Sequence, residues 1–185
     1  MTRPHRNFIG VDDAPFAPQH RGDVALVGAF YTGTRLDGVV TGRAERDGSD
    51  ATDRLVAMVQ GCRFNPRVVL LGGIAVGGFN VVDIHALHAR TGRAVLVVAR
   101  RDPDMVAIRA ALERVPGGTE KLALIERAGP MEPLEAVWVQ RAGLTAQEAA
   151  RILRETTLHG KVPEPLRVAH LIAGALATGH SRGDA

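Results

Sequence analysis

The chain has 185 residues, which is enough for one domain with a buried core, and its balance of 45% hydrophobic against 23% charged residues is typical of a globular protein. Aromatic residues make up only 4%, with Trp138 and Tyr31 single, which disfavours a base-stacking platform for single strands. The net charge is +3, and the positively charged residues are almost all arginine, since Lys121 and Lys161 are the only lysines. Arginine suits phosphate contacts, although a GC-rich genome produces the same bias. Cys62 is alone, which excludes a disulfide framework and a cysteine zinc site.

Hydropathy gives no indication of a membrane protein. The N-terminus is polar, and no apolar run reaches the roughly 18 residues that a spanning helix needs. We therefore expect no signal peptide and no membrane contact, and a soluble protein of the cytoplasm.

Three strands with short connections are predicted first, at residues 8–12, 24–31 and 36–44. Their connections are too short for crossover helices, so they should form an antiparallel meander. The first strand runs directly into Asp12 and Asp13. Because side chains alternate along a strand, these two carboxylates should point to opposite faces of the sheet.

Strands and helices alternate in the rest of the chain. Helices are predicted at 52–61, 80–91, 102–117, from Thr145 onward and at 164–177, and strands at 68–71, 94–99, 122–126 and 136–140. The fully apolar strands 68–71 and 94–99 are of the buried parallel kind. We predict one α/β domain over residues 1–185, with a mixed sheet of three antiparallel strands followed by parallel ones and helices on both faces.

Four side chains with metal or acid–base chemistry fall where the chain leaves an ordered element or lies on a late helix. They are Asp12, Asp50, Asp83 and His170. Mg²⁺ and Mn²⁺ prefer carboxylate oxygens and keep several waters, and such ions activate water for phosphodiester hydrolysis. The set therefore indicates a metal-dependent hydrolase.

His170 has two interpretations. Its helix is apolar nearly all round and is expected to be buried, and a histidine in such a place is most often a core residue bonded to a carbonyl. Arg167 lies three residues earlier, on the same side of the helix. Two polar groups aimed the same way favour a lined cavity instead.

Paired glycines bracket the exit of the strand 68–71, at Gly72-Gly73 and Gly77-Gly78. No Lys-Ser/Thr follows them, so this is not a phosphate loop of the Walker type. Glycines permit a close approach to a helix or a nucleic-acid strand. A tight strand-to-helix turn explains them equally well.

Several of these segments together resemble a known family. They are Gly10-Val11-Asp12, the stretches 47–52 and 77–83, and Pro163-Glu164-Pro165-Leu166-Arg167-Val168-Ala169-His170. The pattern is similar to endonuclease V and, more closely, to the largely archaeal endonuclease dU family, and it covers about residues 8–182. The resemblance implies an RNase-H-like fold and Mg²⁺-dependent cleavage near a deaminated base.

The resemblance also implies a site. The first-strand ligand falls on Asp12, the second on Asp50, with Asp47 as the competing register, and the C-terminal group on His170. Endonuclease V has a further aspartate at the end of the fourth strand, where this chain has Gly72. Asp13 or Asp83 is then the candidate for the missing metal ligand.

We therefore predict an Mg²⁺- or Mn²⁺-dependent endonuclease for uracil- or hypoxanthine-containing nucleic acid, with DNA favoured over RNA. A catalytically reduced nucleic-acid-binding protein on the same fold is the alternative. Contacts to nucleic acid are expected from Arg46, Gly77, Gly78, Asn80 and Arg167. A local patch made by Arg43, Arg46, Arg100, Arg101 and Arg167 would add phosphate contacts. The oligomeric state is left open.

Overall fold

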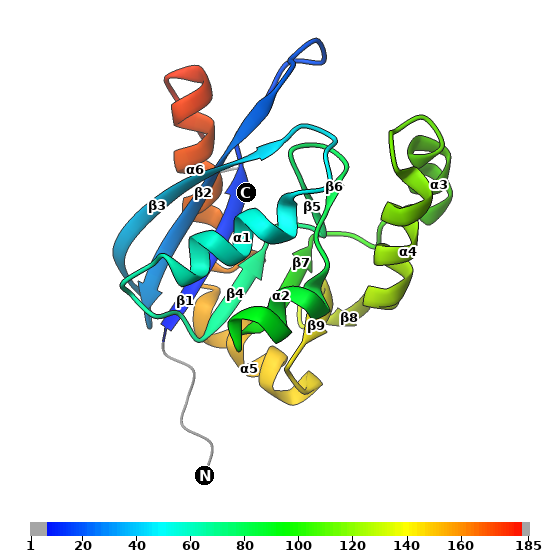
Figure 1. Cartoon of the computed structure of the whole chain (residues 1–185). Coiled ribbons are helices and arrows are strands. Elements are labelled where there is room, and N and C mark those ends of the chain that lie inside the picture. The colour runs from blue at the N-terminus through cyan, green and yellow to red at the C-terminus, as the bar shows by residue number, and fades with distance from the viewer. Residues whose placement is uncertain (1–6, 183–185) are drawn as a thin grey trace.

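A seven-stranded mixed sheet is the centre of the computed structural model, which describes residues 7–182 (Figure 1). The strand order is β3-β2-β1-β4-β7-β9-β8. The predicted α/β class with a mixed sheet is thus confirmed. The extreme ends of the predicted domain, residues 1–6 and 183–185, lie outside the described residues, and its extent stays a prediction.

The strand that ends in Asp12 is central, as its apolar sequence requires. β1 (Asn7–Asp13) pairs antiparallel with β2 (Asp23–Thr32), which pairs antiparallel with β3 (Arg35–Glu45). On its other side β1 pairs in parallel with β4 (Val68–Leu71). The predicted meander is confirmed, and the first acidic position lies in the middle of the sheet.

The second half of the sheet is only partly parallel. β7 (Ala94–Ala99) continues the parallel set beside β4. β9 (Val137–Ala142) runs antiparallel to β7, and the short β8 (Glu132–Leu134) forms a hairpin with it at the edge. The prediction of parallel strands after the meander is therefore right for β4 and β7 and wrong for β9.

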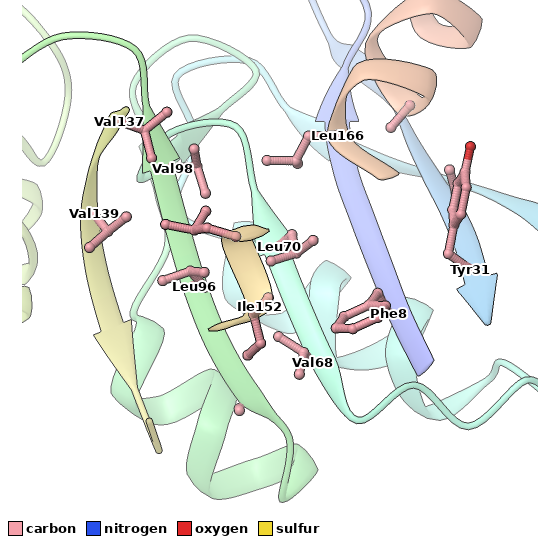
Figure 2. Close-up of a cluster of buried hydrophobic side chains, with 14 of the residues drawn as sticks. Phe8, Tyr31, Val68, Leu70, Leu96, Val98, Val137, Val139, Ile152 and Leu166 are labelled. Atoms are coloured by element: carbon pink, nitrogen blue, oxygen red, sulfur yellow. The ribbon is translucent and has the colours of Figure 1, made fainter. Parts of the chain in front are cut away.

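Helices cover both faces of the sheet, as predicted. α1 (Ala51–Gln60) and α2 (Ile84–Thr91) pack on one face, with Ile9 and Val11 of β1. α5 (Ala146–Thr156) and α6 (Glu164–Thr178) pack on the other, where Phe8 joins a core shared with Leu166 and Ile152 (Figure 2). Successive β1 residues thus point to opposite faces, which sets the directions of Asp12 and Asp13.

α3 (Met105–Leu112) and α4 (Gly118–Ala128) form a helical pair at the side of the molecule, beyond β7 and β9 (Figure 1). α4 replaces the strand predicted at 122–126. A short apolar run fits either element, and here Lys121 and Ile125, one helical turn apart, form the buried stripe. The helix predicted at 80–91 begins only at Ile84, because Asn80–Val81 forms a small hairpin, β6, with β5 (Ala75–Val76).

No helix within residues 7–182 is both long and apolar enough to cross a bilayer, and α6, the longest of them, has 15 residues.

Candidate functional site

The carboxyl end of β1 and the start of α6 approach each other closely. A Cβ built on Gly10 would lie 2.3 Å from the carbonyl carbon and oxygen of Pro165. Only glycine permits this separation, so the first turn of α6 rests directly on the backbone of β1. One and a half turns later, the same helix carries His170 over the end of the strand.

Asp12 and His170 meet across 158 residues of sequence. The Nδ1 atom of His170 lies 2.8 Å from Oδ2 of Asp12, and Oδ1 of Asp12 accepts a hydrogen bond of 3.0 Å from the amide of Asp13. Burial raises the pKa of the Asp12 carboxyl, while the His170 hydrogen bond opposes the rise. His170 lines a cavity together with Asp12, and its side chain is 49% exposed, so the core interpretation is wrong.

This pair lines a cavity of about 560 Å³ at the carboxyl edge of the sheet. The lining residues are Asp12, Gly72, Val98, Ala99, Arg100, Arg101, Val162, Leu166 and His170. Among them Asp12 is the only carboxylate, and two arginines follow the end of β7. The cavity thus joins one carboxylate, one imidazole and two guanidinium groups, a combination suited to a phosphate ester.

Gly72 lies directly beside Asp12, at the end of the neighbouring strand. A Cβ at this position would be 3.5 Å from Oδ1 of Asp12, which is ordinary contact distance. A carboxylate at position 72 would therefore share the cavity with Asp12. This chain lacks that group at the place where endonuclease V was expected to have one.

Asp13 turns away from the cavity. Its Oδ2 accepts a hydrogen bond of 3.0 Å from the amide of Gly77, on the face covered by α1. Burial, and next the charge of Asp12, raise the pKa of Asp13 to about 6. The predicted alternation of the two carboxylates is confirmed, and Asp13 supplies no oxygen to the cavity.

Asp50 is bound into the start of α1. Its Oδ1 accepts from the amide of Glu45 at 3.0 Å and from Nδ2 of Asn80 at 2.7 Å, and its Oδ2 accepts from Nε of Arg54 at 2.8 Å. The competing candidate, Asp47, accepts from the amide of Phe79 at 2.8 Å. Neither carboxylate lines the cavity around Asp12.

Asp83 is the N-cap of α2. It accepts from the amide of Ala86 at 3.0 Å and forms an ion pair with Arg127. The predicted metal ligands are therefore not brought together, and no group of three or more His, Cys, Asp or Glu side chains within residues 7–182 is arranged around a common cation position. The expected convergence of Asp50 on Asp12 is absent.

The donor set around Asp12 fits one hard divalent cation and does not fit two. Mg²⁺ is commonly held by one or two carboxylates together with substrate phosphates and water. Asp12 supplies one carboxylate, and the cavity leaves room beside Gly72. A two-ion centre needs a bridging carboxylate and further oxygen ligands, which the lining residues do not provide.

The residues predicted to contact nucleic acid have structural partners. Nη1 of Arg46 donates to the carbonyls of Pro18 at 2.7 Å and His20 at 2.6 Å, which secures the loop after β1. Arg167 forms two hydrogen bonds, of 2.8 and 2.6 Å, with Glu164. These bonds occupy both guanidinium groups, and their contact with nucleic acid stays a prediction.

Asn80 and the glycines hold the β5–β6 hairpin against the loop after β3. Asn80 is fully buried, and its Oδ1 accepts from the amide of Ala51 at 2.9 Å. Gly78 has a φ of +85°, and a Cβ there would lie 2.4 Å from Oδ1 of Asp47. Gly77 and Gly78 thus form the turn of a β-hairpin and not the strand-to-helix turn that the sequence left open, and a nucleic-acid role stays a prediction.

Arg100 and Arg101 line the cavity, although the sequence motifs placed them only in a patch for phosphate contacts and not in the site. They follow the buried strand β7, whose carboxyl end lies at the same edge as that of β1 because both strands are parallel to β4. The signal in the sequence was their position directly after an apolar strand.

Comparisons with known proteins show the family and the fold of this chain. The family model described as endonuclease dU matches residues 4–177. A UPF0215 protein of Deinococcus radiodurans is 56% identical over 176 residues, which cover 95% of this chain and 91% of that protein.

Solved structures extend the relation. A protein of unknown function from Archaeoglobus fulgidus has a TM-score of 0.87 at 34% identity, covering 94% of this chain and 99% of that one. Endonuclease V of Ciona intestinalis, solved with a DNA that contains an inosine, has a TM-score of 0.55 at 12% identity, covering 89% and 82%. The second likeness is one of fold. The chain belongs to the endonuclease dU family and has the fold of endonuclease V.

Proposed function

We propose that this protein is an endonuclease of the cytoplasm that hydrolyses a phosphodiester bond in nucleic acid containing a deaminated base, uracil or hypoxanthine, with DNA preferred over RNA. The observation that carries the proposal is the Asp12–His170 pair in a cavity edged by two arginines. Membership of the endonuclease dU family and the shared fold with an endonuclease V bound to inosine-containing DNA support it.

His170 has the geometry of a general base. The carboxylate of Asp12 accepts the proton on Nδ1, so Nε2 keeps its lone pair. An imidazole held in this way can take a proton from a water molecule that attacks phosphorus. Asp12 orients the ring and stabilises the imidazolium that forms.

Arg100 and Arg101 are placed to bind the phosphate. Both line the cavity, and both are exposed to solvent. Guanidinium groups bind phosphate oxygens in a bidentate manner, and they stabilise the charge that develops on those oxygens as the bond to the attacking water forms.

A single Mg²⁺ or Mn²⁺ fits this arrangement, held by Asp12 and by the substrate's own phosphate. When bound, such an ion polarises the phosphoryl oxygen and lowers the pKa of a bound water. Asp12 retains this capacity because, among the residues that the structure describes, its Oδ1 has the adjacent Asp13 amide as its one partner.

Gly72 favours a second candidate, a protein that binds nucleic acid on the same fold without cutting it. The glycine removes a carboxylate from the position that lies 3.5 Å from Oδ1 of Asp12. Charge and geometry for a second ion are lost with it. A single measurement distinguishes the binding function from the nuclease function.

That measurement is a nicking assay on uracil- and hypoxanthine-containing strands, with Mg²⁺, with Mn²⁺ and with a chelator. We expect wild-type cleavage, loss of cleavage in Asp12→Asn, and retention in Asp13→Asn, whose side chain lies on the other face of the sheet. Binding of the strand by the protein without any cleavage, under all ion conditions, would assign the binding role. Equal loss in both variants would contradict the site described above.

A further inference from the structure

A second cavity, of about 690 Å³, opens on the other side of the carboxyl edge of β7. Its walls are largely apolar and come from the β4–β5 connection, from α3 and α4 and from the loop before β8, with Ile74, Met105, Ile108, Ile125 and Met131 as the bulky lining residues. Ala99 and Arg101 line both cavities. The two cavities therefore adjoin at this edge of the sheet.

Gln140 is the polar exception among the buried residues of this chamber. It lies on β9 opposite Val97 and is 5% exposed. Its Nε2 donates a hydrogen bond of 2.6 Å to the carbonyl of Gly129, a bond that also decides which end of the amide is the oxygen. Its Oε1 has no hydrogen-bond partner among the residues that the structure describes.

A buried acceptor without a partner destabilises the folded chain, and a ligand that donates a hydrogen bond to it offsets this cost. The ligand must also fill an apolar space with a planar or compact body. Those two requirements are met by a nucleobase whose ring nitrogen carries a proton.

We propose that the second cavity receives the modified base and that Gln140 Oε1 accepts a hydrogen bond from its ring N–H, which makes Gln140 a specificity-determining residue. This inference rests on the proposed function. Deamination converts N3 of cytosine and N1 of adenine from acceptors into N–H donors. An acceptor at this place thus meets a donor in uracil or hypoxanthine and a repelling lone pair in cytosine or adenine.

Gln140 by itself does not separate uracil from thymine or hypoxanthine from guanine, which also carry a ring N–H. The cost of bringing the base into the cavity adds to the selection. A deaminated base is mispaired in a duplex, and extruding a mispaired base costs less than extruding a paired one.

The test is metal-free binding of labelled single strands to the full chain, measured by fluorescence anisotropy, so that the readout does not depend on cleavage. The strands differ at one base: uracil, cytosine, or 3-methyluracil, in which the methyl group replaces the N3 proton. We expect wild-type protein to bind the uracil strand about tenfold to a hundredfold more tightly than the other two, as one hydrogen bond to a buried acceptor implies.

Gln140→Met keeps the size of the side chain and removes its acceptor, so the three strands should bind with nearly equal affinity. Gln140→Glu retains acceptor oxygens but loses the hydrogen bond to the Gly129 carbonyl, which links β9 to the loop before β8. This variant therefore separates the acceptor role of Gln140 from its role in holding that loop. A merely structural Gln140 would weaken all strands equally in both variants and leave their ratio unchanged. Two results would overturn the inference. One is the same preference for the uracil strand in Gln140→Met as in wild type, and the other is no preference in wild type.

The binding assay and the nicking assay together separate this inference from the proposed function. Cleavage of the uracil strand by wild type, together with equal binding of the uracil and cytosine strands, would leave the nuclease intact and refute the role of Gln140. Uracil-selective binding without cleavage under any ion condition would refute the nuclease and support the base site.

Discussion

Gly10→Ala tests how α6 brings His170 to Asp12. A Cβ at position 10 would lie 2.3 Å from the backbone of Pro165, whereas ordinary contacts begin near 3.4 Å. Backbone atoms cannot rotate out of the way as the end of a side chain can. The first turn of α6 must therefore move away from β1 by about 1 Å, and His170, one and a half turns further along, moves with it.

The expected effects follow from that displacement. Overpacking of a tight contact costs about 1–3 kcal/mol, which for a chain of 185 residues lowers the melting temperature by about 2–12 °C. Misplacement of a reacting group by about 1 Å costs about a hundredfold in rate. Melting would be followed by calorimetry, and cleavage by the nicking assay at a temperature where the variant is folded.

Gly174→Ala is the matched control, because it makes the same change on the same helix. A Cβ at position 174 would meet only the side chain of Ser181, whose Oγ, at 2.6 Å, can rotate away and whose Cβ, at 3.2 Å, needs a shift of a few tenths of an ångström. Alanine also favours a helix over glycine by about 1 kcal/mol. We expect unchanged or higher melting and full cleavage. A Gly10→Ala protein that melts lower yet cleaves at the wild-type rate would refute the positioning argument.

Three further predictions concern the site. Gly72→Asp should create a carboxylate pair with Asp12, so Mg²⁺ or Mn²⁺ should raise the melting temperature of this variant more than that of wild type or of Gly72→Asn; equal shifts in all three would contradict a cation at this edge. Asp13 has a folded-state pKa of about 6 against an ordinary 3.8, so its contribution to stability is present below pH 3.8 and is lost as pH rises through 6, by at most about 3 kcal/mol. Asp13→Asn should therefore melt higher than wild type at pH 8 and alike at pH 4, and parallel pH profiles would show that this carboxyl is not responsible. His170→Ala should abolish cleavage with little change in melting temperature, since the ring is half exposed. A large fall in melting temperature with cleavage intact would show that the role of His170 is structural.

Local pattern was sufficient for the buried strands of the central sheet, but it gave no indication of β8 (Glu132–Leu134) at the edge. The apolar runs that form β2, β4 and β7 are uninterrupted and bounded by turn residues, so only a buried strand fits them. Pattern failed at 122–126, where an apolar run of four residues, Leu122 to Ile125, suits either element. The contact of Lys121 and Ile125 with the body of the protein decided for α4, and that contact is not local.

The candidate site divides in the same way. The sequence alone determined that a carboxylate ends the first strand, that Asp13 faces away from it and that His170 lies on a late helix, because strand alternation and helix formation are local properties. Family resemblance added the expectation that Asp50 joins Asp12. The carboxylate of Asp50 instead accepts hydrogen bonds from Glu45, Asn80 and Arg54.

Only the tertiary structure decided which polar groups meet. The hydrogen bond between Asp12 and His170 depends on the close approach of α6 to Gly10, and the unpaired oxygen of Gln140 depends on the position of the Gly129 carbonyl. A carboxylate or an amide can satisfy its hydrogen bonds with many partners, and sequence spacing does not rank them. Packing between distant segments of the chain selects one partner for each such group. The same packing therefore decides which polar groups remain available to a substrate.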